Sequence, residues 1–105
     1  MLIQIKTDRT IKQDNGLTQR VETVVRDAVK RYDKHVTRVV IHLTDENGET
    51  KAGPDDKHCR LEARVAGHQP IAVSHQAATV EQSVGGAAGK LSRSLERVFE
   101  RWNEP

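Results

Sequence analysis

Apolar residues recur along this chain with two different periods, and the changes of period predict where strands and helices lie. Residues 38–45 and 57–66 alternate apolar and polar side chains, as half-buried strands do. Residues 1–6 and 71–75 are short and rich in β-branched side chains, which predicts two further strands. Residues 46–57 carry turn-forming and charged residues in a run too long for a tight hairpin, so we expect a mobile loop there.

Two other segments carry apolar residues three or four positions apart, which is the spacing of amphipathic helices. The first helix runs from Leu17 to about His35, after turn and N-cap residues at Asp14-Asn15-Gly16. The second begins at Thr79, which Gln82 follows at the spacing of a capping box. The predicted buried stripes are Leu17, Val21, Val24, Val25, Ala28, Val29 and Tyr32 on the first helix, and Val80, Val84, Ala87, Leu91, Leu95, Val98 and Trp102 on the second.

The element order is therefore β-α-β-β-β-α, with no internal repeat and no linker. A helix that connects the first two strands makes them parallel, and short turns make the remaining strands an antiparallel meander. We predict an α+β fold, a two-layer sandwich in which a four-stranded mixed sheet carries two helices on one face, as a single domain over residues 1–105. The other face of the sheet is predicted to meet water, and it carries His42, Arg60, Glu62 and Arg64.

The composition limits the function classes. Hydrophobic residues make up 35% and charged residues 30% of the 105 residues, which predicts a thin core under an ionic surface. The single cysteine, Cys59, cannot form an intrachain disulfide, so we expect a reducing, cytoplasmic compartment. No segment has the length and hydropathy of a membrane span or a signal peptide. The aromatic residues Tyr32, Phe99 and Trp102 are too few for recognition of single-stranded nucleic acid by base stacking.

The net charge is only +2, but the last helix sorts its charges by face. On a helical wheel Lys90, Arg93, Arg97 and Arg101 fall within an arc of about 80° beside the apolar stripe, with acidic residues on the other flank. Arg93, Arg97 and Arg101 form like-charge pairs four residues apart, and each pair costs about 0.2–0.5 kcal/mol in an isolated helix. Bound phosphates would relieve this repulsion, so the pattern favours a polyanionic partner.

The first helix repeats this pattern more weakly. Its basic residues Arg20, Arg26, Lys30, Arg31 and Lys34 share one broad side, but well-oriented pairs such as Glu22 with Arg26 explain much of it as an ordinary solvated face. The last helix also contains glycines at 85, 86 and 89, each unfavourable by about 1 kcal/mol relative to alanine. These glycines either make the first turns of the helix flexible or allow a phosphate backbone to approach the helix closely. We favour the first interpretation.

No residue pattern predicts catalysis, a metal or a cofactor. Strand alternation sends His58 and Cys59 to opposite faces, and Cys59 is best interpreted as a small core residue. Ser74-His75 lacks the G-x-S-x-G turn of a nucleophile elbow, and no phosphate-cradling loop for a small-molecule substrate occurs. Asp55-Asp56 is interpreted as a solvated acidic run, with a cation site as a weak alternative. We therefore expect no enzyme.

The element order and several short stretches resemble the ribosome hibernation-promoting factor and ribosome-associated inhibitor family, also described as sigma-54 modulation proteins or ribosomal subunit interface proteins. The resemblance covers nearly the whole chain, and the order and spacing of the stretches carry it rather than any single motif. The stretches are Thr37-Arg38-Val39, His42 to Gly48, Asp55-Asp56-Lys57 to Cys59, Glu62-Ala63-Arg64, Gln69 to Val73 and Lys90-Leu91-x-Arg93, of which the middle ones resemble a short proteobacterial subgroup.

The resemblance implies a fold like that of double-stranded-RNA-binding domains and a factor without enzymatic activity. The factor would bind the decoding region of the small ribosomal subunit, block tRNA and mRNA access, and silence translation in stationary phase or stress. Lys90, Arg93 and Arg97 stand where the family carries its basic ridge, and Lys30 matches its first-helix pattern loosely. With the charge pattern, the predicted rRNA-binding residues are Lys90, Arg93, Arg97 and Arg101 on the last helix and Arg26, Lys30 and Lys34 on the first.

The last helix departs from the family pattern. Glu81 stands in place of a tyrosine, Gly85 and Gly89 in place of acidic residues, and Glu96 where a basic residue is frequent. Residues 98–105 replace a tail rich in lysine and histidine. The resemblance is to the short form of the family, which lacks a dimerising C-terminal domain, so we do not expect this chain to pair ribosomes by itself.

A second function class stays open beside ribosome binding. The same fold could serve as a protein-interaction or regulatory module that recognises a partner through the open sheet face, at Arg60, Glu62 and Arg64. Such binding would persist at high salt, whereas binding to a polyanion would weaken steeply.

Overall fold

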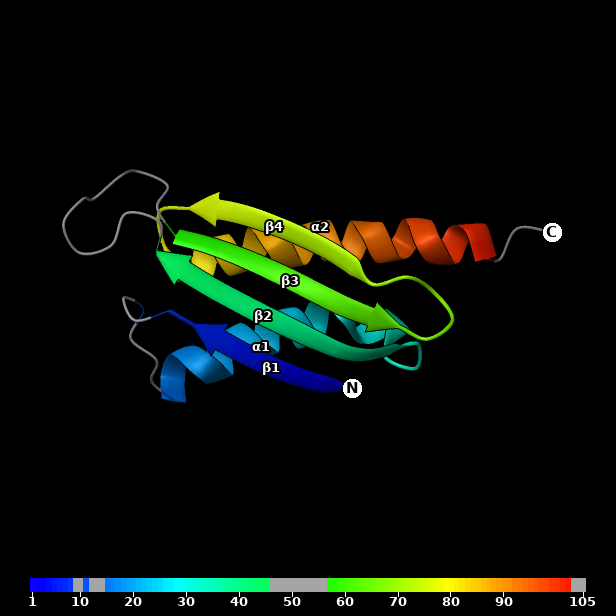
Figure 1. Cartoon of the computed structure of the whole chain (residues 1–105), viewed down its shortest axis with the longest axis horizontal. Helices are drawn as coiled ribbons and strands as arrows, with labels where there is room; N and C mark the ends of the chain where they lie inside the picture. Colours follow the sequence, from blue (N-terminus) through cyan, green and yellow to red (C-terminus); the bar gives the residue numbers. More distant parts are fainter. Residues whose placement is uncertain (9–10, 12–14, 46–56, 103–105) are drawn as a thin grey trace.

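The computed structural model describes residues 1–8, 11, 15–45 and 57–102. Within these residues the chain folds in the predicted order of four strands and two long helices (Figure 1). The elements are β1 (Leu2–Thr7), α1 (Asn15–Val29) with a 3₁₀ turn η1 (Lys30–Tyr32), β2 (Val36–Asp45), β3 (Lys57–Val65), β4 (Ile71–Ala77) and α2 (Val80–Trp102). No helix among them is long and apolar enough to cross a membrane.

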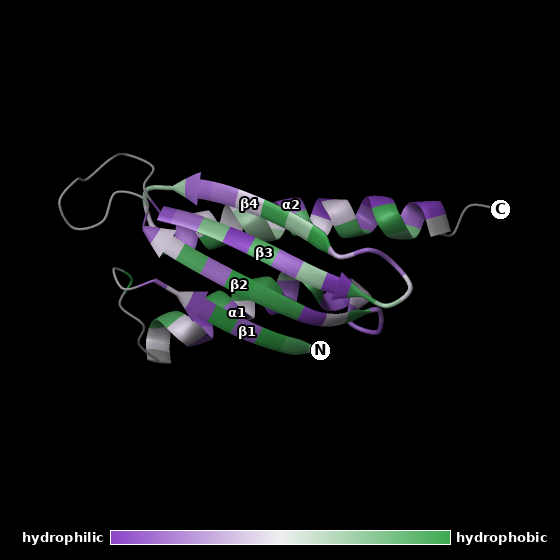
Figure 2. Ribbon diagram, in the orientation of Figure 1, coloured by the Kyte–Doolittle hydropathy of each residue, from purple (hydrophilic) through white to green (hydrophobic). Residues whose placement is uncertain are grey.

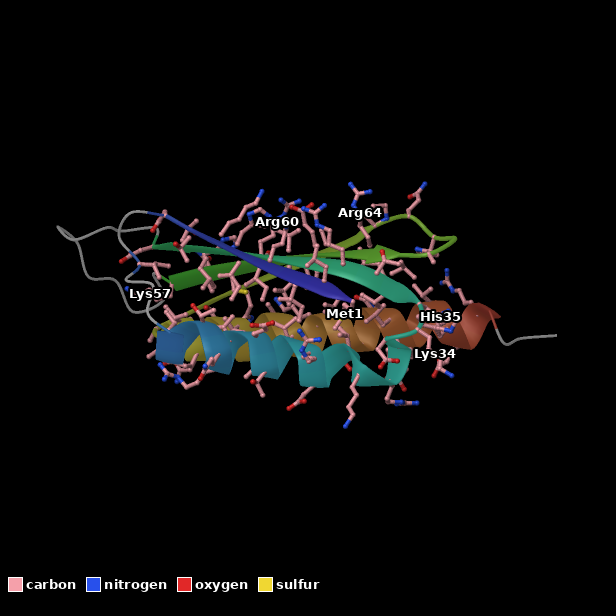
Figure 3. The ribbon with its side chains drawn as sticks, turned by 90° about the horizontal axis from the view of Figure 1, so that it is seen from below. Met1, Lys34, His35, Lys57, Arg60 and Arg64 are labelled. Carbon is pink, nitrogen blue, oxygen red and sulfur yellow. The ribbon has the colours of Figure 1, made fainter. Side chains whose placement is uncertain are left out.

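The four strands form one mixed sheet in the order β1-β2-β3-β4. β1 runs parallel to β2 because α1 crosses over between them, while β2, β3 and β4 are antiparallel. Both helices lie on one face of this sheet, as Figure 3 shows from the edge. The prediction of a two-layer α+β sandwich with a mixed sheet is confirmed.

Strand alternation determines which side chains form the core. Val39, Ile41 and Leu43 of β2 are at most 1% exposed and face the helices. Their neighbours in sequence point to the open face, and the alternation is visible as bands along the strands in Figure 2. The helices complete the core with Val21, Val25, Val29, Val84, Ala87, Leu91 and Leu95.

The first helix differs from the prediction at its C-terminal end and in one residue of its buried stripe. The first helix is α-helical only to Val29, and its last turn tightens to 3₁₀ geometry so that Tyr32 stacks on Phe99 of α2, with ring centroids 4.9 Å apart. Val24, predicted in the buried stripe, is 40% exposed, because Val21, Val25 and Val29 already fill the i, i+4, i+8 positions that face the sheet.

Several predicted features fall on residues that are not described. Residues 46–56 of the predicted mobile loop, including Asp55-Asp56, lie outside the described part of the chain, as do Asp14 and the side chain of Trp102. The last residue of that predicted loop, Lys57, is the first residue of β3, and its Nζ lies 3.2 Å from Oδ2 of Asp45 at the end of β2.

Candidate nucleic-acid interface

Capping and burial fix the orientation of α2, and therefore the direction in which its charged side chains point. The backbone N–H of Gln82 donates to Oγ1 of Thr79 at 3.1 Å, as the capping-box spacing predicted. Ser83 is fully buried, and its hydroxyl donates to the carbonyl oxygen of Val80 at 2.8 Å, so its burial leaves that hydroxyl satisfied. Leu91 and Leu95 are fully buried in the core. This buried stripe turns the basic side of α2 outward.

The basic ridge of α2, formed by Lys90, Arg93, Arg97 and Arg101, lies along the flank that borders β4. All four side chains are exposed. Nζ of Lys90 donates to the carbonyl oxygen of Ser74 in β4 at 2.8 Å, so this side of α2 lies next to β4. Among the described residues none of the four forms an ion pair, although Glu96 and Glu100 stand on the same helix. The ridge therefore presents four uncompensated cations to solvent.

A groove of about 290 Å³ lies at the C-terminal half of this ridge. Arg97 and Arg101 line one side of it, and His68 and Ile71 line the other. His68 stands in the turn between β3 and β4, where Gly67 adopts a φ of +75° that a residue without a Cβ tolerates best. Sequence reasoning did not assign His68 to the interface, because no spacing rule connects this turn to a helix thirty residues further along the chain.

The basic residues of the first helix are not all in the helix itself. Arg26 lies within α1 and pairs with Glu22 at 3.0 Å, the i, i+4 pair that the sequence predicted. Lys30 opens η1, and Lys34 lies in the turn after it, where its side chain is exposed near the end of α1 (Figure 3). Arg26 and Lys30 line a separate groove with Met1 at the start of β1.

The two groups of basic residues consequently lie on opposite flanks of the helix layer. The two helices contact each other on their inner sides, where Arg20 of α1 forms an ion pair with Glu81 of α2 at 3.5 Å and the rings of Tyr32 and Phe99 stack. The ridge borders β4 on the far side of α2, while Arg26 and Lys30 lie toward β1 on the far side of α1. The helices pack side by side, but the ridge and the α1 cations do not form one continuous surface.

Comparison with known families now identifies the chain. A family model described as "Sigma 54 modulation protein / S30EA ribosomal protein" matches residues 8–103. The chain belongs to this family. A comparison with curated proteins gives no match. The family that the sequence resemblance implied is therefore confirmed over nearly the whole chain.

Two solved structures share the fold of this S30EA family member. One is a ribosomal subunit interface protein from Coxiella burnetii, with a TM-score of 0.76 and 14% identity over 95% of this chain and 99% of that one. The other is the N-terminal domain of Protein Y from Thermus thermophilus, with a TM-score of 0.73 and 15% identity over 93% of this chain and 99% of that one. At these identities the likeness concerns the fold.

The glycines of α2 have different surroundings in this family member. A Cβ added at Gly86 would lie 2.1 Å from Cδ2 and 2.5 Å from Cγ of His75, so Gly86 lets the helix backbone rest on the imidazole ring of β4. A Cβ at Gly85 would meet nothing within 4 Å. A Cβ at Gly89 would lie 3.5 Å from Nη1 of Arg93, whose guanidinium extends over it. For Gly86 the structure thus gives a reason, close packing on β4, that the sequence did not predict.

Cys59 is a core residue, as predicted. It is fully buried between the sheet and the helices, while its neighbour His58 lies on the open face. Burial raises the pKa of the Cys59 thiol to about 12, because the thiolate would lose its hydration. The thiol stays protonated at neutral pH and is a poor nucleophile.

Proposed function

We propose that this protein binds the small ribosomal subunit in its decoding region, where it blocks tRNA and mRNA access and silences translation in stationary phase or stress. Membership of the S30EA family carries the ribosome part of the proposal. The ridge of Lys90, Arg93, Arg97 and Arg101 supplies the surface, since its cations are exposed and form no ion pair with any described residue. Arg26, Lys30 and Lys34 contribute a second, weaker contact from the other flank.

The proposed contact with RNA is electrostatic and does not depend on the base sequence of the RNA. Described aromatic rings lie in the helix layer, where Tyr32 and Phe99 stack on each other. Neither of these two rings offers bases a stacking platform beside the ridge, and guanidinium and ammonium groups bind phosphates whatever the base sequence. Each bound phosphate releases counterions, so affinity must fall steeply with salt. A protein held in this way excludes tRNA and mRNA by occupying their space.

The test is sedimentation of the protein with small subunits, large subunits and whole ribosomes across a salt series. We expect binding to small subunits that weakens steeply with salt. The triple variant Lys90→Gln, Arg93→Gln, Arg97→Gln should lower the slope of log affinity against log salt by about 0.7–0.9 for each phosphate that it no longer binds. Arg20→Gln is the matched control, because it removes one helical arginine that already pairs with Glu81.

Binding in the decoding region also requires that the protein compete with mRNA and tRNA, and the same small subunits test this competition. Small subunits loaded with mRNA and tRNA should exclude the protein, and the protein should exclude both from empty subunits. Thermal unfolding of each variant verifies that it remains folded. Unchanged co-sedimentation of the triple variant would remove the ridge from the site, and simultaneous binding of tRNA and protein would contradict the decoding-region proposal.

A further inference from the structure

The open face of the sheet, opposite the helices, carries a second cationic cluster. Lys6 of β1, Arg38 of β2 and Arg64 of β3 surround a hollow of about 220 Å³, whose lining also includes Val40, His42 and Glu62. Arg64 points away from the helix layer, as does Arg60 further along β3 (Figure 3). None of these residues belongs to the ridge or to the basic residues of α1.

The strand register brings these cations together against their mutual repulsion. Arg38 lies directly opposite Arg64 across the β2–β3 pair, and Lys6 lies opposite His42 across the β1–β2 pair. Like charges at directly opposite positions destabilise a sheet. No ion pair among the described residues offsets this repulsion, so a bound anion is the simplest reason for the arrangement.

The one carboxylate of the hollow is already occupied. Oε1 of Glu62 accepts from Nη1 of Arg60 at 2.9 Å and lies 3.0 Å from Nε2 of His42. Among the described residues Lys6, Arg38 and Arg64 form no ion pair. The hollow therefore holds three cations without an ion pair in the described chain, beside one carboxylate whose Oε1 is shared by Arg60 and His42.

Arg38 gives a second, independent sign of a missing ligand. One of its terminal nitrogens donates to the side-chain oxygen of Gln4, which anchors the guanidinium. Its Nε atom is buried and has no hydrogen-bond partner among the described residues. A buried donor without an acceptor is costly, and a small rotation of the Arg38 side chain toward the hollow would let a bound anion accept this hydrogen bond.

We propose that this hollow is an anion site that takes a phosphate group of RNA. The inference rests on the proposed function, since its ligand is of the same class. The four described strands carry no Phe, Tyr or Trp on the open face; the apolar lining of the hollow is the half-buried Val40 and the exposed Pro70, and the exposed Leu2 lies opposite Arg38. Protein interfaces bury aromatic and apolar anchors at their centre, whereas a phosphate needs only the cations found here, so the composition favours RNA over an acidic peptide.

The proposal makes a specific statement about the bound state. The hollow and the ridge lie on opposite layers of the molecule, the hollow on the sheet and the ridge on α2. A protein that uses both contacts RNA on two sides, so it is inserted between two RNA segments and does not rest on one. Loss of either surface should then weaken binding without abolishing it.

The first experiment compares the intact chain with Arg38→Gln/Arg64→Gln in the salt series on small subunits. We expect at least a tenfold loss of affinity and a salt slope lower by about 0.7–0.9 for each phosphate that the variant no longer binds. Arg20→Gln is the charge-matched control, because Arg20 already pairs with Glu81 in the helix layer and lies outside the hollow, and it should change affinity less than twofold. Arg64→Gln alone, which removes an exposed side chain, tests the site if Arg38→Gln disturbs the hydrogen bond with Gln4.

The second experiment identifies the ligand directly. The Nε–H signal of Arg38 in ¹⁵N NMR spectra should shift when a short oligouridylate is added and should not shift with a glutamate-rich peptide of equal charge. A shift with the peptide alone would overturn the RNA proposal in favour of a protein partner. A shift with inorganic phosphate that oligouridylate cannot displace would overturn it in favour of a free phosphate.

The two proposals fail separately. If the ridge variant loses binding while Arg38→Gln/Arg64→Gln binds like the intact chain, the anion site on the sheet is refuted and the proposed function stands. If only the sheet variant loses binding, the ridge assignment is refuted and the anion site stands. If both bind like the intact chain, both are refuted.

Discussion

Gly86 provides the most demanding test of the helix-on-sheet packing. Replacing it with alanine adds a Cβ that would lie 2.1–2.5 Å from three atoms of the His75 ring, Cδ2, Cγ and Nε2. Carbon atoms in contact stay about 3.5–4.0 Å apart, so the ring must turn away or α2 must lift from β4. Because Cγ is held close to the β4 backbone, turning the ring about its own axis cannot relieve the overlap.

The magnitude follows from two opposing effects. Overpacking of this kind costs about 1–3 kcal/mol. Alanine is better than glycine inside a helix by about 0.8–1 kcal/mol. The free energy of unfolding of Gly86→Ala should therefore fall by up to about 2 kcal/mol. Gly85→Ala is the control one residue away, because its Cβ would meet nothing within 4 Å, and it should gain about 1 kcal/mol.

Urea unfolding of the three proteins measures these differences, and thermal unfolding should separate the two variants in the same order. A shift of about 4–8 °C in Tm accompanies each kcal/mol in a domain of this size. His75→Ala combined with Gly86→Ala should recover part of the stability, since the ring that the new methyl group meets is gone. If Gly86→Ala proves as stable as Gly85→Ala, the close packing of Gly86 on His75 is refuted.

Two further predictions concern the core. Burial raises the pKa of Cys59 to about 12, so above pH 9 the unfolded chain loses its thiol proton while the native protein keeps it. The free energy of unfolding should consequently fall between about pH 9 and 12, by at most about 1.4 kcal/mol per pH unit. Urea unfolding of Cys59→Ala across the same pH range should lack this fall. Equal pH dependence of the free energy of unfolding in the two proteins would contradict the prediction. Phe99→Leu keeps an apolar side chain but removes the ring that stacks on Tyr32, so unfolding in urea should become easier by about 0.5–1.5 kcal/mol, while Phe99→Tyr should restore most of it.

Much of the fold was predictable because apolar residues repeat regularly, every second residue in the strands and every third or fourth residue in the helices. Alternation in β2 and β3 placed Ile41 and Leu61 inside and His42 and Arg60 outside, and the structure agrees. Where prediction failed, a partner distant in sequence decides the outcome. The first helix changes to 3₁₀ geometry at Lys30, next to the contact of its last turn with α2, which no local pattern reveals.

The candidate site was less predictable for the same reason. A helical wheel places Arg93, Arg97 and Arg101 on one side of α2, but it cannot say which neighbour that side borders. The hydrogen bond from Lys90 to β4 and the pair of Arg20 with Glu81 place the two basic groups on opposite flanks. The hollow on the sheet likewise depends on the register that sets Arg38 against Arg64, and register is invisible across the long connection between β2 and β3.

The small net charge of +2 conceals this arrangement, because the acidic residues are distributed unevenly along the chain. Residues 46–56 hold four of the fifteen acidic residues and only one lysine. The rest of the chain holds sixteen of the seventeen basic residues and eleven acidic ones. Arg97 and Arg101 stand in the C-terminal half of α2, exposed and without an ion pair to any described residue. An exposed ridge of this kind turns toward a polyanion during approach, so the encounter with RNA is faster and better oriented than the net charge suggests.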